Sequence, residues 1–96
     1  MPSFRVTLTV GLLRPGVDPS SIVPAAAAAA RMLTTVEASD LAVVSGTARV
    51  TVRFIAEDAE LARQIGEHVA SQTAQSAAVD AWKVTERVGA RWYVVR

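Results

Sequence analysis

The side chains best suited to binding chemistry in this chain are arginines and threonines that recur at every second position of short stretches. Guanidinium groups bind carboxylates and phosphates through paired hydrogen bonds, and hydroxyls add further donors and acceptors. A period of two places such side chains on one face of a β-strand. The pattern therefore predicts a cationic, hydroxyl-rich sheet face, with candidate binding residues Arg5, Thr7, Thr9, Arg49, Thr51, Arg53 and Arg87.

We expect one carboxylate and one aromatic ring on the same face. A two-residue turn at Ser45-Gly46 would place Asp40 opposite Thr51 in a hairpin. A second turn at Gly89-Ala90 would place Trp92 opposite Arg87. Such a ring either covers the arginines through a cation–π contact or anchors an interface. We favour the second role and predict a homodimer interface that includes Trp92 and Val94.

Residue patterns typical of catalysis or metal binding are not found in the chain. His68, the single histidine, falls in the middle of a predicted helix, where we expect a boundary residue that is exposed or hydrogen-bonded. The chain has no cysteine, which excludes disulfides and thiolate metal sites, and one histidine is too few for the usual zinc ligand sets. We predict no catalytic residue, no metal and no cofactor.

Composition indicates one globular domain over residues 1–96, since 51% of the residues are hydrophobic and 20% are charged. The formal net charge of +1 gives no electrostatic reason to expect a nucleic-acid partner. The longest apolar run, residues 23–30, is far shorter than the roughly 20 residues that a membrane span requires. The first strand follows Met1 without a signal-peptide-like apolar block, so we expect a cytoplasmic protein.

Hydrophobic periodicity and turn residues predict the order of the elements. Asp18-Pro19 is typical of a helix start, but Pro24 allows two arrangements: a separate single turn before the helix, or a kinked first turn. The run of alanines at residues 25–30 either fills the helix without a further role or forms a contact between subunits. We expect strands over 4–12, 38–44, 47–56, 79–88 and 91–95, and helices over 25–33 and from 57 onward.

Strand parity predicts which side chains face the helices. Even-numbered residues of the first, third and fourth strands are expected to point inward, which places Trp82 in the core. The first helix is expected to bury a stripe that ends in Leu33 and Val36. Continuing the hairpin register would carry Glu37 to the apolar side, so we expect a bulge or strand end near Ser39.

The order β-α-β-β-α-β with an extra C-terminal strand resembles the ferredoxin-like arrangement, an α+β two-layer sandwich with an antiparallel sheet and both helices on one face. We expect a small non-catalytic module that acts by homo-oligomerisation or by binding a partner or ligand. One alternative is a dimeric α/β-barrel-type enzyme or small-ligand-binding protein that uses a cavity between sheet and helices. Another is anion or RNA binding on the basic face, although the central strands carry no outward aromatic for stacking bases.

Overall fold

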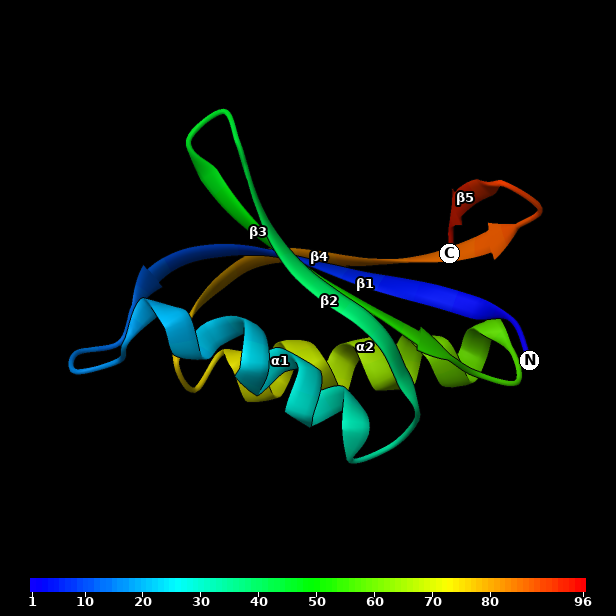
Figure 1. Cartoon of the computed structure of the whole chain (residues 1–96), viewed down its shortest axis with the longest axis horizontal. Helices are drawn as coiled ribbons and strands as arrows, with labels where there is room; N and C mark the ends of the chain where they lie inside the picture. Colours follow the sequence, from blue (N-terminus) through cyan, green and yellow to red (C-terminus); the bar gives the residue numbers. More distant parts are fainter.

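A five-stranded antiparallel sheet with two helices on one side forms the computed structural model, which describes residues 1–96 (Figure 1). The strand order is β2-β3-β1-β4-β5, and every neighbouring pair is antiparallel. This α+β architecture is compatible with the ferredoxin-like expectation. The elements are β1 (Ser3–Leu13), a 3-10 turn (Pro19–Ser21), α1 (Ile22–Arg31), β2 (Val36–Val44), β3 (Thr47–Ile55), α2 (Ala59–Thr73), β4 (Ala77–Val88) and β5 (Arg91–Val94).

The core lies between the helices and the two central strands, β1 and β3. The predicted parity is confirmed over most of both strands, since the buried residues are Phe4, Val6, Leu8 and Val10 of β1 and Val50, Val52 and Phe54 of β3. The expected burial of Leu12, near the end of β1, is wrong, because this side chain is 86% exposed. The rings of Phe4 and Phe54 stack with centroids 6.1 Å apart. The pairing of Arg5 with Arg53 across these strands leaves the odd-numbered, polar side chains on the face without helices.

On β4 the parity changes partway along the strand. The register with β1 shifts after Thr9, so that Val10 pairs with Val79 and the buried residue near the strand start is Ala77. An irregularity of this kind inserts residues in one strand and reverses which parity faces inward. The even-numbered rule therefore holds at Val84, which is buried, but not at the beginning of β4.

The prediction that Trp82 belongs to the core is wrong. Trp82 pairs with Leu8 and packs near Gly66 of α2, so it points to the helix side, but it remains 41% exposed. At this position β4 is the edge of the sheet, because β5 pairs only with residues from Thr85 onward. One side of the indole therefore has no neighbouring strand to cover it.

Of the two arrangements that Pro24 allowed, the structure has the separate turn before the helix. Asp18 caps a separate 3-10 turn, and its carboxylate accepts a hydrogen bond from the Ser20 amide at 2.9 Å. Helix α1 begins after this turn, and Pro24 lies in its first turn. Backbone amides in the first turn have no acceptor within the helix, so a proline there removes no helical hydrogen bond. The expected burial of Leu33 is wrong: α1 ends at Arg31, and Leu33 beyond it is 55% exposed.

The β2–β3 hairpin has the predicted turn and register. Ser45 and Gly46 have φ values of 53° and 77°, as a type I′ turn requires, and Asp40 lies opposite Thr51. The bulge lies at Glu37 rather than Ser39, because Val36 pairs with Phe54 and Ala38 already pairs with Arg53. Glu37 and Ala38 therefore share one partner, and Glu37 turns to the polar face.

Candidate functional site

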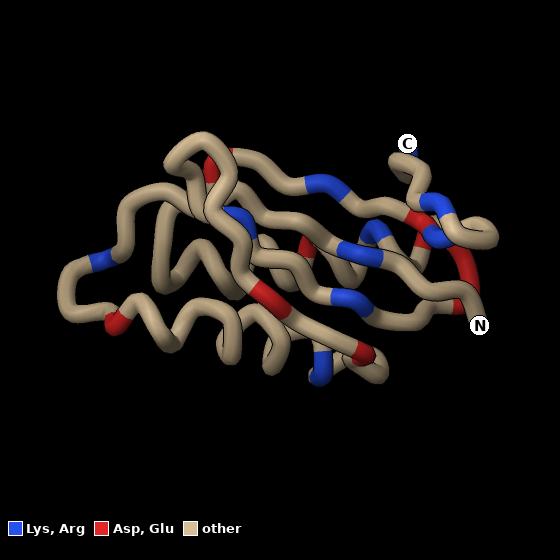
Figure 2. Tube along the Cα trace, turned by 45° about the horizontal axis from the view of Figure 1, so that its top comes forward, with Lys and Arg blue, Asp and Glu red and all other residues tan.

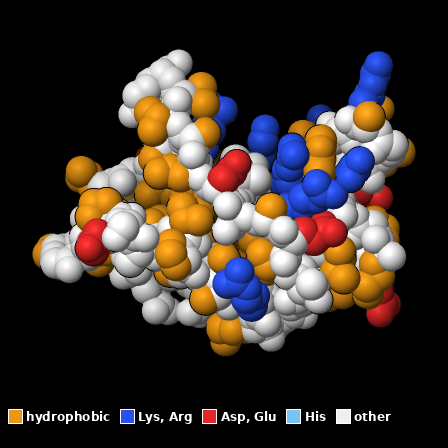
Figure 3. Space-filling model, viewed as in Figure 1, with side chains coloured by type: hydrophobic (Ala, Val, Ile, Leu, Met, Phe, Trp, Pro, Cys, Tyr) orange, Lys and Arg blue, Asp and Glu red, His pale blue; other side chains and the backbone are white.

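The sheet face without helices is hollowed into a trough. Figure 1 shows the β2–β3 hairpin rising at one end of the sheet and β5 rising at the other, both away from the helices. The space-filling view shows the hollow between these two walls, with basic side chains inside it (Figure 3). The trough encloses about 520 Å³ and is lined by Arg5, Thr7, Ala38, Ser39, Asp40, Ala42, Thr51, Arg53, Lys83, Thr85, Trp92 and Val94.

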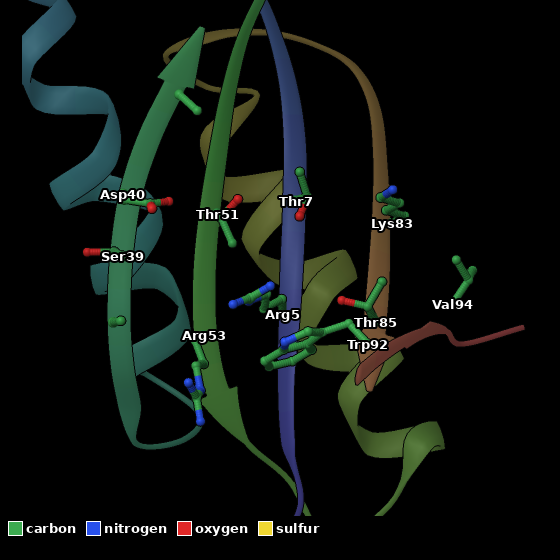
Figure 4. A pocket seen from close by; sticks show the side chains of 12 residues that line it. Arg5, Thr7, Ser39, Asp40, Thr51, Arg53, Lys83, Thr85, Trp92 and Val94 are labelled. Carbon is green, nitrogen blue, oxygen red and sulfur yellow. The ribbon is translucent and has the colours of Figure 1, made fainter. Parts of the chain in front are cut away.

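Each strand supplies a different part of this lining (Figure 4). The central strands β1 and β3 supply the floor, which carries two arginines and the hydroxyls of Thr7 and Thr51. β4 adds Lys83 and Thr85, which lie across from Thr7 and Arg5 in the pairing register. The bulged strand β2 contributes small and acidic side chains, and β5 contributes apolar surface.

Positive charge dominates the trough. Arg5, Arg53 and Lys83 face a single lining carboxylate, Asp40. The Cα trace turned toward the open face shows basic positions on adjacent strands (Figure 2). Groups of one sign in a concave surface reinforce each other's potential and attract ions of the opposite sign. The site therefore favours an anionic occupant.

The ring of Trp92 lies over the arginines of the floor. The guanidinium carbon of Arg5 is 3.8 Å from the ring centroid, and that of Arg53 is 5.4 Å from it. Both distances lie within the roughly 6 Å range of cation–π attraction. The cation–π alternative left open by the sequence therefore has direct geometric support, although its partners are Arg5 and Arg53 rather than the neighbouring Arg87 and Arg91.

Glu37 pairs with Arg53 of the trough, although Glu37 itself does not line the trough. Its Oε1 accepts a hydrogen bond from the Ser3 hydroxyl at 2.7 Å and forms an ion pair with Nε of Arg53 at 3.1 Å. The Ser3 hydrogen bond, aided by the charge of Arg53, lowers the pKa of Glu37 below its ordinary value of 4.5. Glu37 thus stays ionised at neutral pH and orients the guanidinium of Arg53 on the floor of the trough.

The structure brings together only some of the predicted binding residues. Arg5, Thr7, Thr51 and Arg53 meet in the trough. Thr9 and Arg49 line a smaller neighbouring hollow of about 200 Å³, which also borders Thr7 and Lys83. Arg87 is in neither hollow, because its Nε donates a hydrogen bond to the Gly89 carbonyl at 2.9 Å within the turn.

Other lining residues were not among the candidates. Ser39, Ala38 and Ala42 of β2 reach the trough because the Glu37 bulge and the curl of the hairpin bring this edge strand over the sheet. Lys83 and Thr85 have the outward parity of β4, so the alternation of that strand was a signal by which they could have been included among the candidates. Nothing local in the sequence signals the curl that makes β2 a wall.

His68 lies on α2, in the layer opposite the trough, and is half-buried. This position agrees with the expected boundary residue, but its Nε2 atom is buried and has no hydrogen-bond partner, so the expected exposure or hydrogen bond is not found at that atom. The structure contains no group of three or more His, Cys, Asp or Glu side chains arranged to hold a metal ion. Neither helix has the length and apolar character needed to cross a lipid bilayer.

No protein-family model, curated protein or solved structure matches this chain. The trough and its side chains are therefore the features of this chain from which a function can be proposed.

Proposed function

We propose that this chain is a ferredoxin-like domain without catalytic machinery that binds a small organic anion in the trough. The order of the elements and the antiparallel strand order β2-β3-β1-β4 support the fold assignment, with β5 as an addition at the edge. The observation that carries the function is the convergence of three cationic side chains and several hydroxyls in one concave site.

The size and lining of the trough fit a small molecule. Its volume of about 520 Å³ lies within the range of roughly 300–1,000 Å³ typical of ligand pockets. Arginine and lysine would hold a carboxylate or phosphate through charge-assisted hydrogen bonds, and threonine hydroxyls would orient it. Trp92, Val94 and the alanines of β2 offer apolar surface to the remainder of the ligand. The ligand class is therefore an anion with a small apolar portion.

Self-association through the same face is less favoured than ligand binding. A two-fold axis through the trough would bring its cationic groups toward their own copies, and like charges at an interface oppose association. RNA binding is also less favoured, because Trp92 is the one aromatic ring in the trough and it already stacks with Arg5.

A homodimer through β5 is a second candidate function. Tyr93 and Val94 are 51% and 50% exposed on this edge strand, and exposed apolar edges favour pairing. The enzyme alternative required a cavity between sheet and helices. The trough and the smaller hollow beside it both lie on the open face, and the sheet–helix layer contains the buried cluster around Phe4, Phe54 and Ile65.

The anion proposal is tested by nuclear magnetic resonance titration of the ¹⁵N-labelled protein with inorganic phosphate, succinate and benzoate at constant ionic strength. We expect saturable shifts of backbone amides in the trough, at Thr7, Thr51 and Lys83, with at least one probe. Replacing Lys83 by glutamine removes one charge-assisted contact and should weaken binding by about tenfold or more.

The matched control is Arg63→Gln, which makes the same change of net charge on the exposed side of α2. This variant should bind the probe as the unmodified chain does. Equal weakening by both variants would indicate a nonspecific charge effect. Absence of any saturable shift in the trough at millimolar concentrations of all three probes would refute the proposal.

A further inference from the structure

The outer edge of β2 has backbone groups without partners. In a type I′ hairpin the residues beside the turn, Val44 and Thr47, form a hydrogen-bonded pair, and such pairs alternate along an antiparallel ladder. It follows that the amide and carbonyl groups of Ser39, Leu41 and Val43 point away from β3. β2 is the last strand of the sheet on this side, so these groups face solvent.

The second half of β2 lacks the usual protection of a sheet edge. Natural edge strands are protected by charged residues, proline, bulges, or a cover of helix or loop, which prevent pairing with another chain. The bulge and the charges of β2 lie at Glu37 and Asp40, whereas residues 41–44 carry no charge, proline or bulge, and all residues of β2 after Val36 are exposed. Leu41 is 54% exposed and Val43 is 67% exposed, although both lie on the helix side of the sheet opposite Val50 and Ala48.

Helix α1 extends this apolar surface beside β2. Ile22, Ala26 and Ala29 are buried against the domain, whereas Ala25, Ala28 and Met32 recur at helical spacing on an exposed flank. Both α1 and β2 lie at the front in Figure 1, with α2 behind α1, and the same view in space-filling form shows apolar side chains gathered there (Figure 3). The β2 wall is the surface formed by Ala25, Ala28, Met32, Leu41 and Val43.

We infer that the β2 wall binds a second copy of this chain, by antiparallel pairing of β2 with its own copy around a two-fold axis at Leu41. In this register Leu41 faces Leu41 of the other copy, and Ser39 faces Val43, so the residues with free backbone groups meet in hydrogen-bonded pairs. The two sheets would become continuous, with both helix layers on the same side. The alanines of α1 would allow the two copies of this helix to approach closely.

The charge of Asp40 disfavours a neighbouring register. Asp40 faces Ala42 of the other copy, whereas an axis one residue earlier would place Asp40 directly against its own copy, and like charges directly opposite destabilise a sheet.

Cysteine crosslinking tests the register directly, because the chain has no cysteine of its own. In the proposed pair the two Leu41 Cα atoms lie about 5.5 Å apart, within the roughly 4.4–6.8 Å range of disulfides. Leu41→Cys should therefore form a covalent dimer in high yield under mild oxidation. Val43→Cys is the matched control, because its two copies would lie about 14 Å apart, and it should remain monomeric on a nonreducing gel.

The mass in solution provides a second measurement. At tens of micromolar the unmodified chain should have twice its monomer mass of 10.1 kDa by light scattering. Val43→Lys places a charge in the paired edge and should reduce the mass to that of the monomer, with an unchanged circular dichroism spectrum. Val94→Lys makes the same change on β5, the opposite edge, and should leave the dimer intact.

Three results would overturn the inference. A monomeric unmodified chain at these concentrations would exclude the dimer, and equal crosslinking of Leu41→Cys and Val43→Cys would exclude the register. Loss of the dimer in Val94→Lys but not in Val43→Lys would assign the interface to β5 instead. None of these outcomes depends on whether the trough binds an anion.

Discussion

The guanidinium of Arg5, on the central strand β1, lies 3.8 Å from the ring centroid of Trp92, on the edge strand β5. The two residues come from opposite ends of the chain, and β4 lies between their strands in the sheet. The contact joins the last hairpin to the floor of the trough, and Trp92 and Val94 of β5 line the trough on that side. Through this contact, the C-terminal strand β5 packs against one of the cationic side chains of the candidate site.

A double-mutant cycle with Arg5→Gln and Trp92→Leu should show this contact as a coupling energy. We expect about 0.5–1 kcal/mol of coupling in the free energy of unfolding by urea, the value for a partly exposed cation–π pair. The control cycle combines Arg87→Gln with Trp92→Leu. Arg87 lies directly opposite Trp92 but bonds to the Gly89 carbonyl, so its coupling should be near zero. Coupling that is larger for Arg87 would contradict the described geometry.

The ionised state of Glu37 should make stability depend on pH in the acid range. The hydrogen bond from Ser3 lowers the pKa of Glu37 in the folded chain below 4.5, so its contribution is fully present above about that pH. The contribution is lost as the pH falls through the folded-state pKa. Glu37→Gln should lower the free energy of unfolding at pH 7 by up to about 1 kcal/mol, since the pair is partly exposed to screening solvent.

The comparison at two pH values separates this effect from a general loss of stability. At a pH well below the folded-state pKa, where Glu37 is protonated, the difference between Glu37→Gln and the unmodified chain should shrink toward zero. Glu67→Gln, on the exposed side of α2, is the control and should have little effect at either pH. A deficit of Glu37→Gln that stays constant between the two pH values would contradict the role of the ionised carboxylate.

Gly66 permits the close approach of α2 to β4. A Cβ at this position would lie 2.5 Å from Cγ2 of Val84 and 3.2 Å from Cζ3 of Trp82. Gly66→Ala should therefore destabilise the fold by about 1–3 kcal/mol through overpacking, despite the better helix propensity of alanine. Thermal unfolding measures the change. In the double variant Gly66→Ala with Val84→Ala the clash is relieved, so the second substitution should cost less than it does alone.

Thr73 and Thr34 should respond in opposite ways to replacement by valine. The Thr73 hydroxyl is buried without a partner, so Thr73→Val removes an unsatisfied group at nearly constant volume and should leave stability unchanged or raise it by up to about 1 kcal/mol. The Thr34 hydroxyl donates to the Ile55 carbonyl at 2.6 Å, and Thr34→Val should cost about 1 kcal/mol. Denaturant midpoints give both values; equal losses would contradict the assignment.

Local patterns were enough to predict most of the fold. Alternation of apolar and polar residues located β1 and β3 and the side of each residue, because a strand has a side-chain period of two. The turns at Ser45-Gly46 and Gly89-Ala90 were recognisable for the same local reason, since positive φ angles favour glycine. The partnership of Asp40 with Thr51 followed from turn length alone.

The predictions were wrong at residues whose burial or pairing is determined by contacts with residues distant in the chain. Trp82 has the inward parity of a core residue, but its burial depended on how far β5 extends along β4. Leu33 has the spacing of a buried stripe, but the stripe stops where α1 ends. The bulge lies at Glu37, where the carboxylate accepts hydrogen bonds from Ser3 and Arg53 of the neighbouring part of the sheet, and these partners are distant in the chain.

For the candidate site, too, the sequence predicted one part and the tertiary structure determined the other. The residue types of the polar face, arginine and threonine at odd positions of β1 and β3, follow from the sequence because each strand carries its own alternation. Its concave shape does not, since the curl of the β2–β3 hairpin and the fold of β5 over Arg5 arise from contacts between elements. Side-chain chemistry is local to each strand, whereas the volume that brings Arg5, Arg53 and Lys83 together exists only after the strands assemble and twist.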